Sequence, residues 1–268
     1  MDVTKAVSVA RMSDVGLMRS QNEDSVASDL TTGLVMVADG MGGYKAGEIA
    51  SQMTTLIIAA ELAELIHQQS QLRKSHHLSM AEMFKRAVAV ANNLVYQTSQ
   101  QQPICSGMGT TLVAGVFYDN KIIVGHIGDS RLYRFRGGVL EQLTEDHSLL
   151  QEQINAGLIT KEQARLSNDG HLVTRALGTE PEVELELNEY EALIGDCYLL
   201  CSDGLTDLVE DDEIEEIIAS SNGNIHLAAS SLIRLANKYG GADNVSVVVA
   251  LVQDAFAIKQ GWIQKLWG

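Results

Sequence analysis

Apolar and polar residues follow two different periods along the chain. Short runs rich in β-branched residues and bounded by turn residues predict strands, and they cover residues 7–12, 25–28, 33–38, 197–201 and 245–252. Apolar residues that recur at helical spacing predict amphipathic helices, and they cover residues 48–69, 80–95, 211–220 and 225–239. The chain therefore combines strands and helices, and two long helices follow the first strands.

The middle of the chain has the pattern of successive hairpins. Strands are predicted at residues 110–118, 121–127, 130–136 and 139–143. They are joined by Asp119-Asn120, Gly128-Asp129 and Gly137-Gly138, pairs that favour hairpin turns. We expect an antiparallel meander. Its first two strands are apolar on both faces, so both faces should be covered. An α+β fold follows, with a layer of helices over stacked sheets.

The length of 268 residues suits one continuous core. Residues 144–177 turn from helical to polar and irregular, which predicts a small insertion at about 150–172. We therefore expect a single domain over residues 1–255, with residues 256–268 as a C-terminal tail that forms a final helix or binds a partner.

Charge and cysteine content narrow the function class. The net charge of −16, without clusters of Lys and Arg, argues against nucleic-acid binding. Cys105, Cys197 and Cys201 form no zinc-type pair, and an odd number of cysteines fits a reducing compartment. The chain shows no basic leader and no run of about 18 apolar residues. We expect a cytoplasmic protein with no membrane contact.

Four aspartates share one situation at strand ends: Asp39, Asp129, Asp203 and Asp243 are each followed by a small or polar residue. Each alone could be a turn or cap residue. If the strands bring them to one edge, the carboxylates would repel one another unless cations bind. Oxygen ligands select Mg²⁺ or Mn²⁺, and the carbonyl of Gly40 could add a ligand. Two such ions can activate a bridging water against a phosphate ester.

An early polar segment could complete such a site. Arg19 can fork two hydrogen bonds onto a phosphate, and the carboxylates of Glu23 and Asp24 follow it closely. Taken alone, an Arg and an acidic pair in a loop are more often a solvated surface.

Eight short motifs occur in a defined order, at residues 19–24, 37–43, 107–111, 128–131, 143–148, 174–178, 201–205 and 241–246. In these motifs the chain resembles the bacterial members of the type 2C, metal-dependent (PPM) family of protein serine/threonine phosphatases. The resemblance covers nearly the whole chain. It implies a four-layer α-β-β-α sandwich of two antiparallel sheets flanked by helices.

The resemblance also implies roles for individual residues. Asp39, Asp203 and Asp243 would hold one ion. Asp39 and the Gly40 carbonyl would hold a second, supported through water by Glu23 and Asp24. Asp129 with Asp203 would hold a third ion, and Arg19 would bind the phosphate. Two or three Mn²⁺ or Mg²⁺ ions are thus expected, with Arg19, Asp39, Asp203 and Asp243 as the catalytic set.

The expected reaction is in-line attack of a metal-bridging hydroxide on phosphoserine or phosphothreonine in proteins. No Cys or Ser lies in an activated nucleophile motif, so we expect no phosphoenzyme. The resemblance implies phosphorylated protein substrates, a cognate serine/threonine kinase and a free-standing monomer. Two alternatives stay open: a non-catalytic member that binds phosphoproteins or regulates a kinase, and a hydrolase of small phosphate esters.

The chain departs from the family at two places. Animal members carry a His where this chain has Met41, and many bacterial members carry one where it has Tyr44. The acid for the leaving group is therefore unassigned, and Tyr44 would be a poor donor because its ordinary pKa is near 10. The flap, at about residues 160–168, is also altered, at residues 165–168, which leaves the substrate preference open.

Other polar residues are interpreted as structural. His126, His147 and His171 are candidates for proton transfer, but satisfied structural histidines are more common, and we assign none as catalytic. Residues that can cap a helix precede the insertion: Thr144, Asp146 and Ser148.

Overall fold

The computed structural model describes residues 3–43, 45–71, 77–160, 163–164 and 172–257. Two sheets form the centre of the molecule, and every pairing in the first is antiparallel. The first sheet has the order β1 (Val7–Asp14), β11 (Val245–Val252), β10 (Cys197–Cys201), β7 (Arg131–Arg136) and β8 (Val139–Gln142).

The second sheet is also antiparallel throughout. Its order is β2 (Asp24–Asp29), β3 (Leu34–Met41), β5 (Leu112–Tyr118), β6 (Lys121–Ile127) and β9 (Glu186–Glu191), with the short β4 (Gly109–Thr110) paired to β3.

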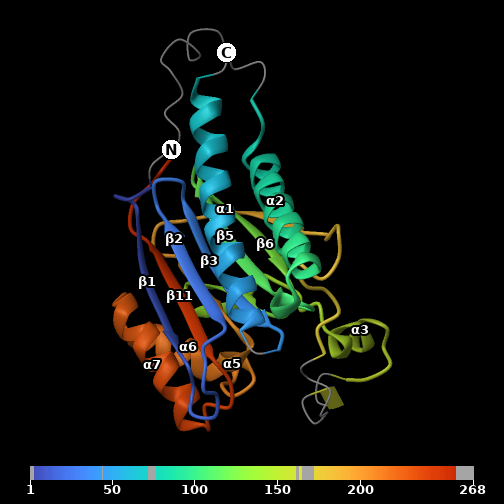
Figure 1. The fold of residues 1–268 in the computed structure, drawn as a ribbon. Helices are drawn as coiled ribbons and strands as arrows, with labels where there is room; N and C mark the ends of the chain where they lie inside the picture. Colours follow the sequence, from blue (N-terminus) through green and yellow to red (C-terminus); the bar gives the residue numbers. More distant parts are fainter. Residues whose placement is uncertain (1–2, 44, 72–76, 161–162, 165–171, 258–268) are drawn as a thin grey trace.

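The two sheets pack face to face, and helices cover their outer faces (Figure 1). Successive side chains of a strand point to opposite faces, so in β3 Val35 and Val37 join the core between the sheets, where they meet Tyr198 and Val248. The alternate residue Met36 packs under the helices instead. Burial of both faces explains the continuous apolar runs of these strands and confirms the expected four-layer sandwich.

Each outer layer is a pair of helices. α1 (Ala46–Ser70) and α2 (Met80–Gln101) cover the second sheet, and α6 (Asp211–Ser220) and α7 (Ile225–Lys238) cover the first. α2 begins at a capping box, in which Ser79 and Glu82 bind each other's backbone N–H groups.

α1 is long and apolar enough to cross a membrane by length and composition alone, although polar residues interrupt its apolar run. In its most apolar window 39 % of the residues are buried inside the protein. Ile58 and Leu62 have no exposed surface and belong to the core beneath the helices. This burial is that of a core helix lying on a sheet.

The expected meander of four strands is wrong as a single sheet. Its two hairpins form as predicted: Asp119 and Asn120 have φ of 45° and 57° between β5 and β6, as a type I′ turn requires, and two glycines join β7 to β8. Residues 128–129, however, are a crossover between sheets. β6 pairs with β9 on its other edge, and β7 pairs with β10.

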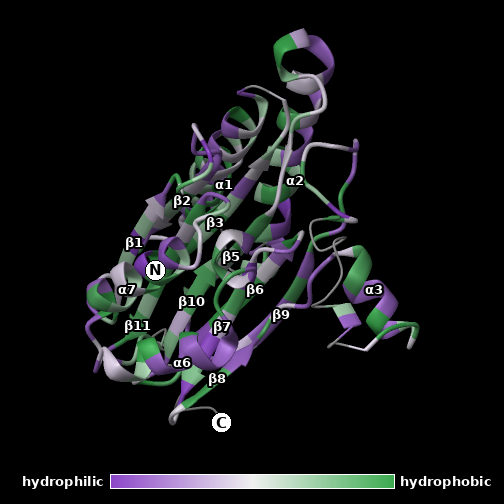
Figure 2. Ribbon diagram, turned by 90° about the horizontal axis from the view of Figure 1, so that it is seen from below, coloured by the Kyte–Doolittle hydropathy of each residue, from purple (hydrophilic) through white to green (hydrophobic). Residues whose placement is uncertain are grey.

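β9 was missed by the sequence analysis. Half of its residues are glutamates, and Figure 2 shows this edge strand mostly in hydrophilic colours. Its pairing with β6 therefore depends on a long-range backbone ladder, which hydrophobic periodicity cannot reveal.

The predicted insertion begins with α3 (Leu149–Asn155). The two ends of the insertion meet, because Ser148 and Val173 form a β-bridge and the Leu149 N–H donates to the Leu172 carbonyl at 2.9 Å. The altered flap residues 165–168 and His171 lie outside the described residues. At the other end of the chain, Phe256 packs edge-on against Phe117 with ring centroids 6.1 Å apart.

Candidate active site and metal centre

Two of the predicted ligands lie opposite each other on neighbouring strands. Asp24 begins β2 and pairs across the ladder with Asp39 near the end of β3. Residues directly opposite in an antiparallel pair direct their side chains to the same face. The Asp24 Oδ2 also accepts a hydrogen bond of 2.9 Å from Ser202 Oγ, next to Asp203 at the start of the short helix α5 (Asp203–Thr206). Ladder and hydrogen bond together bring three carboxylates from separate elements into one place.

The pKa values of these aspartates show that four carboxylates lie close enough to affect one another. Burial raises the pKa of Asp39 well above its usual range, and the charges of Asp24, Asp203 and Asp129 raise it further. Burial likewise raises the pKa of Asp24 to about 7, despite hydrogen bonds from nearby serines. The pKa of Asp129 rises to about 8, through burial and then the charge of Asp203. Without cations, the cluster would retain protons near neutral pH.

Arg19 and Asp243 form the exposed rim of the cluster. The Arg19 Nη2 donates to Asp243 Oδ2 at 2.6 Å, and the two side chains are 56 % and 35 % exposed. This hydrogen bond raises the pKa of Arg19, and the charges of Asp243, Glu23 and Asp203 add to the effect. The guanidinium therefore stands at the entrance, facing the carboxylates.

Glu23 and the Gly40 carbonyl converge on the start of α1. A Cβ atom added to Gly47 would lie 2.7 Å from both Glu23 Oε2 and the Gly40 oxygen. Only glycine allows such a close approach. The Gly40 N–H in turn donates to the Glu23 carbonyl at 3.2 Å. Burial raises the pKa of Glu23, as does the charge of Asp243.

The donor set fits hard divalent cations. All the convergent atoms are carboxylate or carbonyl oxygens, which Mg²⁺ and Mn²⁺ prefer. Within the described part of the chain, the buried Oδ1 of Asp24 has no hydrogen-bond partner. A buried carboxylate oxygen of this kind is costly unless a cation or water satisfies it. The structure places Asp24, Asp39, Asp129 and Asp203 near one another, sets Glu23 beside the Gly40 carbonyl, and pairs Asp243 with Arg19 at the rim.

A polar cavity adjoins this cluster. It has a volume of about 240 Å³ and is lined by Arg19, Ser20, Gln21, Glu23, Gly42 and Asn244. Its polar wall, with one cationic side chain, suits a phosphate group.

Asn244 is a supporting residue that the sequence analysis missed. Its Oδ1 accepts from the Glu23 N–H at 2.8 Å, and its Nδ2 donates to the Val15 and Gln21 carbonyls, each at 2.9 Å. One amide thus fixes the loop that carries Arg19 and Glu23. Its place directly after Asp243 was a signal, but its partners lie more than two hundred positions away.

Two hydroxyl groups hold the backbone and side chains of the cluster. Thr111 Oγ1 accepts from the Asp39 N–H at 3.0 Å and contacts Ser130 Oγ at 2.7 Å. Ser202 Oγ, besides donating to Asp24, accepts from the Ser246 N–H at 3.0 Å. These serines and threonines occur within the quoted motifs, yet no local pattern indicates what they bind.

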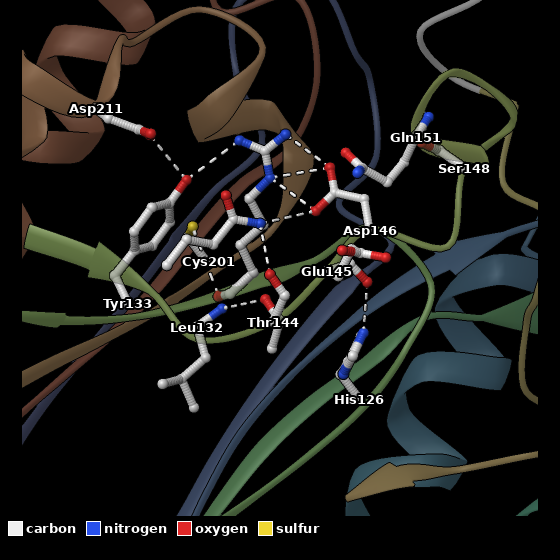
Figure 3. Close-up of polar contacts among 12 residues, drawn as sticks. His126, Leu132, Tyr133, Thr144, Glu145, Asp146, Ser148, Gln151, Cys201 and Asp211 are labelled. Atoms are coloured by element: carbon white, nitrogen blue, oxygen red, sulfur yellow. Dashed lines mark hydrogen bonds and ion pairs between the residues drawn. The ribbon is translucent and has the colours of Figure 1, made fainter. Parts of the chain in front are cut away.

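The expected caps before α3 are only partly correct. Ser148 is the N-cap, accepting from the Gln151 N–H. Asp146 instead accepts from Nε and Nη2 of Arg131 at 2.9 and 2.7 Å, and Thr144 accepts from the Leu132 N–H (Figure 3). A nearby guanidinium is a stronger partner for a carboxylate than a free helix N–H.

Of the three candidate histidines, the structure describes His126 and His147, and both rings have hydrogen-bond partners. His126 Nε2 contacts the Glu145 carbonyl at 2.7 Å (Figure 3), and its ring stacks on His147 at 4.4 Å. His147 Nδ1 accepts from the Gly128 N–H at 3.1 Å. Burial lowers the pKa of His147 to about 4, and His126 and a nearby arginine lower it further. Tyr44, considered as a proton donor, lies outside the described residues.

The same architecture occurs in known proteins. Residues 19–229 match the family model described as protein phosphatase 2C. The chain belongs to the protein phosphatase 2C family. It is 42 % identical over 252 residues to the serine/threonine protein phosphatase PstP of Mycobacterium tuberculosis, which covers 94 % of this chain and 46 % of PstP. This phosphatase 2C chain thus spans about half the length of that relative.

A shorter relative matches almost end to end. The serine/threonine phosphatase stp of Listeria monocytogenes is 35 % identical over 239 residues, covering 88 % of this chain and 92 % of stp. Among solved structures, the catalytic domain of PstP in complex with two manganese ions has a TM-score of 0.81 at 39 % identity, covering 93 % of this chain and 99 % of that one.

Proposed function

We propose that this chain hydrolyses phosphoserine and phosphothreonine in proteins and depends on Mn²⁺ or Mg²⁺. The observation that carries the proposal is the grouping of the buried carboxylates of Asp24 and Asp129 with the partly buried ones of Asp39 and Asp203. Burial and the neighbouring charges raise the pKa values of Asp24, Asp39 and Asp129. A site of this kind requires cations at neutral pH. The family membership and the activities named for PstP and stp support the same reaction.

We assign the metal-binding role to the seven converging residues Glu23, Asp24, Asp39, Gly40, Asp129, Asp203 and Asp243. Two or three bound ions would supply a water of lowered pKa and would neutralise phosphoryl charge. The carboxylates would hold the ions, and the burial of Asp24 and Asp129 limits the access of bulk solvent. The catalytic domain of PstP in complex with two manganese ions supports the binding of such ions by this chain.

Arg19 is the residue that we propose binds the phosphate. Its hydrogen bond to Asp243 uses Nη2 and aligns the guanidinium, whose remaining N–H groups can donate to phosphate oxygens in the polar cavity. A fork of two hydrogen bonds orients the phosphorus for in-line attack. Met41 has no transferable proton, so we assign the leaving-group acid to no side chain.

The proposal extends to the partners, the cellular location and the domain organisation of the protein. We propose phosphorylated protein substrates, opposed by a cognate serine/threonine kinase, and a cytoplasmic monomer. The three buried, free cysteines support a reducing compartment. We further propose that residues 1–255 form the catalytic domain, with the insertion at about 150–172 and a tail at 256–268.

The first test is phosphate release from a phosphothreonine peptide by metal-stripped protein, with and without millimolar Mn²⁺. Asp203→Ala is the matched control. Release that requires Mn²⁺ and disappears in the control supports the proposal. A folded protein that binds Mn²⁺ and releases no phosphate would instead be a non-catalytic member, and faster turnover of a nucleotide than of the peptide would favour a hydrolase of small phosphate esters.

A further inference from the structure

Asp129 lies on a segment that no sheet ladder holds. It follows β6 of one sheet and precedes β7 of the other, and Gly128 adopts a φ of 103° to make the crossover. Asp129 is nonetheless only 7 % exposed. Its position must therefore be set by contacts other than strand pairing.

Two neighbouring residues of another segment bind this turn on both sides of Asp129. Before it, Gly128 is bound twice by His147, whose N–H donates to the Gly128 carbonyl at 2.9 Å and whose Nδ1 accepts from the Gly128 N–H at 3.1 Å. After it, Arg131 is bound by the carboxylate of Asp146 through Nε and Nη2. The turn is thus clamped by a pair of adjacent side chains.

The same histidine also binds the stem of the insertion. The Thr174 N–H donates to the His147 carbonyl at 2.8 Å, next to the bridge between Ser148 and Val173. His147 is therefore the point where both ends of the insertion and the Asp129 turn meet.

The His147 ring is held in the form that this contact needs. Because Nδ1 accepts a hydrogen bond, the proton of the neutral ring is on Nε2, which faces Glu186 Oε2 at 3.4 Å. Arg175 Nη1 also lies 3.1 Å from Nε2. Because Nε2 carries the proton, it has no lone pair free to accept a hydrogen bond from this arginine. We therefore assign Nε2 as the donor to Glu186. Stacking on His126 fixes the plane of the ring.

A second metal site here is the competing explanation. Ligand atoms of His126, His147 and Glu186 all lie within 4.8 Å of one another. The two rings are, however, stacked with an angle of 16° between their planes, so their in-plane lone pairs run parallel and do not meet at one ion. The guanidinium of Arg175 beside Nε2 would also repel a cation. A structural role fits this cluster better.

We propose that His147 is a positioning residue, which holds the Asp129 turn in place for a cation and joins it to the stem of the insertion. The inference rests on the proposed function in one respect, since it takes Asp129 as a metal ligand. Residues that orient metal ligands typically change metal affinity by about 10- to 100-fold when they are replaced.

The test compares variants that keep or remove the acceptor at the Nδ1 position. In His147→Asn the amide oxygen can accept from the Gly128 N–H, whereas His147→Leu has no acceptor. His147→Phe also lacks one but retains a ring to stack on His126, and it replaces the leucine variant if that protein fails to fold. Calorimetric titration of the metal-stripped full chain with Mn²⁺ measures each site. We expect a loss of about tenfold or more in the leucine or phenylalanine variant, at the Asp129-dependent site only, and near-wild-type affinity in the asparagine variant.

A double-mutant cycle with Asp129→Asn isolates the effect. In that background the His147 substitutions should change Mn²⁺ affinity no further. Equal Mn²⁺ affinity of wild type and the acceptor-free variants, a loss that persists in the Asp129→Asn background, or a wild-type protein without an Asp129-dependent site would each overturn the inference. Phosphate release is assayed separately, so an inactive wild type would count against the proposed function while the binding data still decide the role of His147.

Discussion

Asp39 and Asp129 contribute to one carboxylate cluster but are held in place by different means. Asp39 lies within a strand, opposite Asp24 on one side and bound through its backbone to Thr111 on the other. Asp129 lies on a crossover between sheets and depends on side chains of Ser130, Arg131 and their partners. A ladder of backbone hydrogen bonds survives most single substitutions, whereas a turn held by side chains does not. The two ligands should therefore respond differently to mutation.

The largest expected effect is at Asp39. Asp39→Asn removes a charge on which the other carboxylates and the cations converge, and we expect kcat/KM for a phosphothreonine peptide to fall by about a thousandfold, at the upper end for a preorganised electrostatic group. The fold should persist, because the ladder uses backbone atoms. Thermal unfolding of the metal-stripped variant should show no loss of stability, since one repelling charge is gone.

Asp129→Asn should have a smaller effect, because the charges that act on Arg19 are those of Asp243, Glu23 and Asp203. We expect a loss of about 10- to 100-fold at limiting Mn²⁺, reduced by raising the metal concentration. Steady-state assays over a range of Mn²⁺ measure this. A variant as inactive as Asp39→Asn at saturating Mn²⁺ would show that the two ligands do not differ as proposed.

Asp146→Asn tests the clamp on the turn through stability. The Arg131 and Asp146 side chains are 27 % and 12 % exposed, so replacing the carboxylate leaves a largely buried guanidinium without its anion. Breaking a fully buried pair costs about 3 to 5 kcal/mol, and partial exposure reduces our expectation to about 2 kcal/mol. Urea unfolding of the metal-stripped protein gives the value. Glu141→Gln, which removes a carboxylate that is 55 % exposed from its ion pair with Arg134, is the matched control and should cost less, about 1 kcal/mol.

The metal-stripped protein should lose stability as pH rises from about 5 to 8. Burial raises the pKa values of Asp24 and Asp129 to about 7 and about 8, whereas an unfolded aspartate titrates near about 4. Between these values the folded state binds more protons than the unfolded state, so the free energy of unfolding decreases with pH. Melting temperatures measured with and without Mn²⁺ should therefore diverge toward pH 8. Parallel curves would mean that burial and the neighbouring charges do not raise these pKa values as described.

The sequence predicted where strands and helices begin and end better than it predicted which strands pair with each other. Turn pairs and apolar runs gave the bounds of β6, β10, β11 and α6 as the structure has them. They could not show that β6 and β7 belong to different sheets, because pairing with β9 and β10 is a long-range choice.

The same limit applies to the site. The aspartates were recognisable because each stands at a strand end inside a motif. Asn244 and Asp146 were not recognisable as supporting residues. Asn244 binds atoms far away in the sequence, and Asp146 binds a side chain of strand β7. Local patterns thus predict which charged residues lie at the strand ends. The residues that hold those side chains in place can be identified only in the folded structure.

The smallest expected effect on Mn²⁺ binding is at Thr111, which contacts both regions. Its hydroxyl accepts from the Asp39 N–H and contacts Ser130 Oγ. Thr111→Val removes both contacts at a cost of about 1 to 3 kcal/mol in stability. Asp39 keeps its ladder partner and the hydrogen bond of 2.8 Å from the Thr111 N–H to its carbonyl, whereas the turn loses a side-chain contact that no ladder replaces. Calorimetric titration with Mn²⁺ should show a loss of several-fold up to about tenfold at the Asp129-dependent site and little change at the sites that depend on Asp39. Equal weakening of all sites would mean that the cluster behaves as one rigid unit, and the distinction between ladder-held and side-chain-held ligands would have to be abandoned.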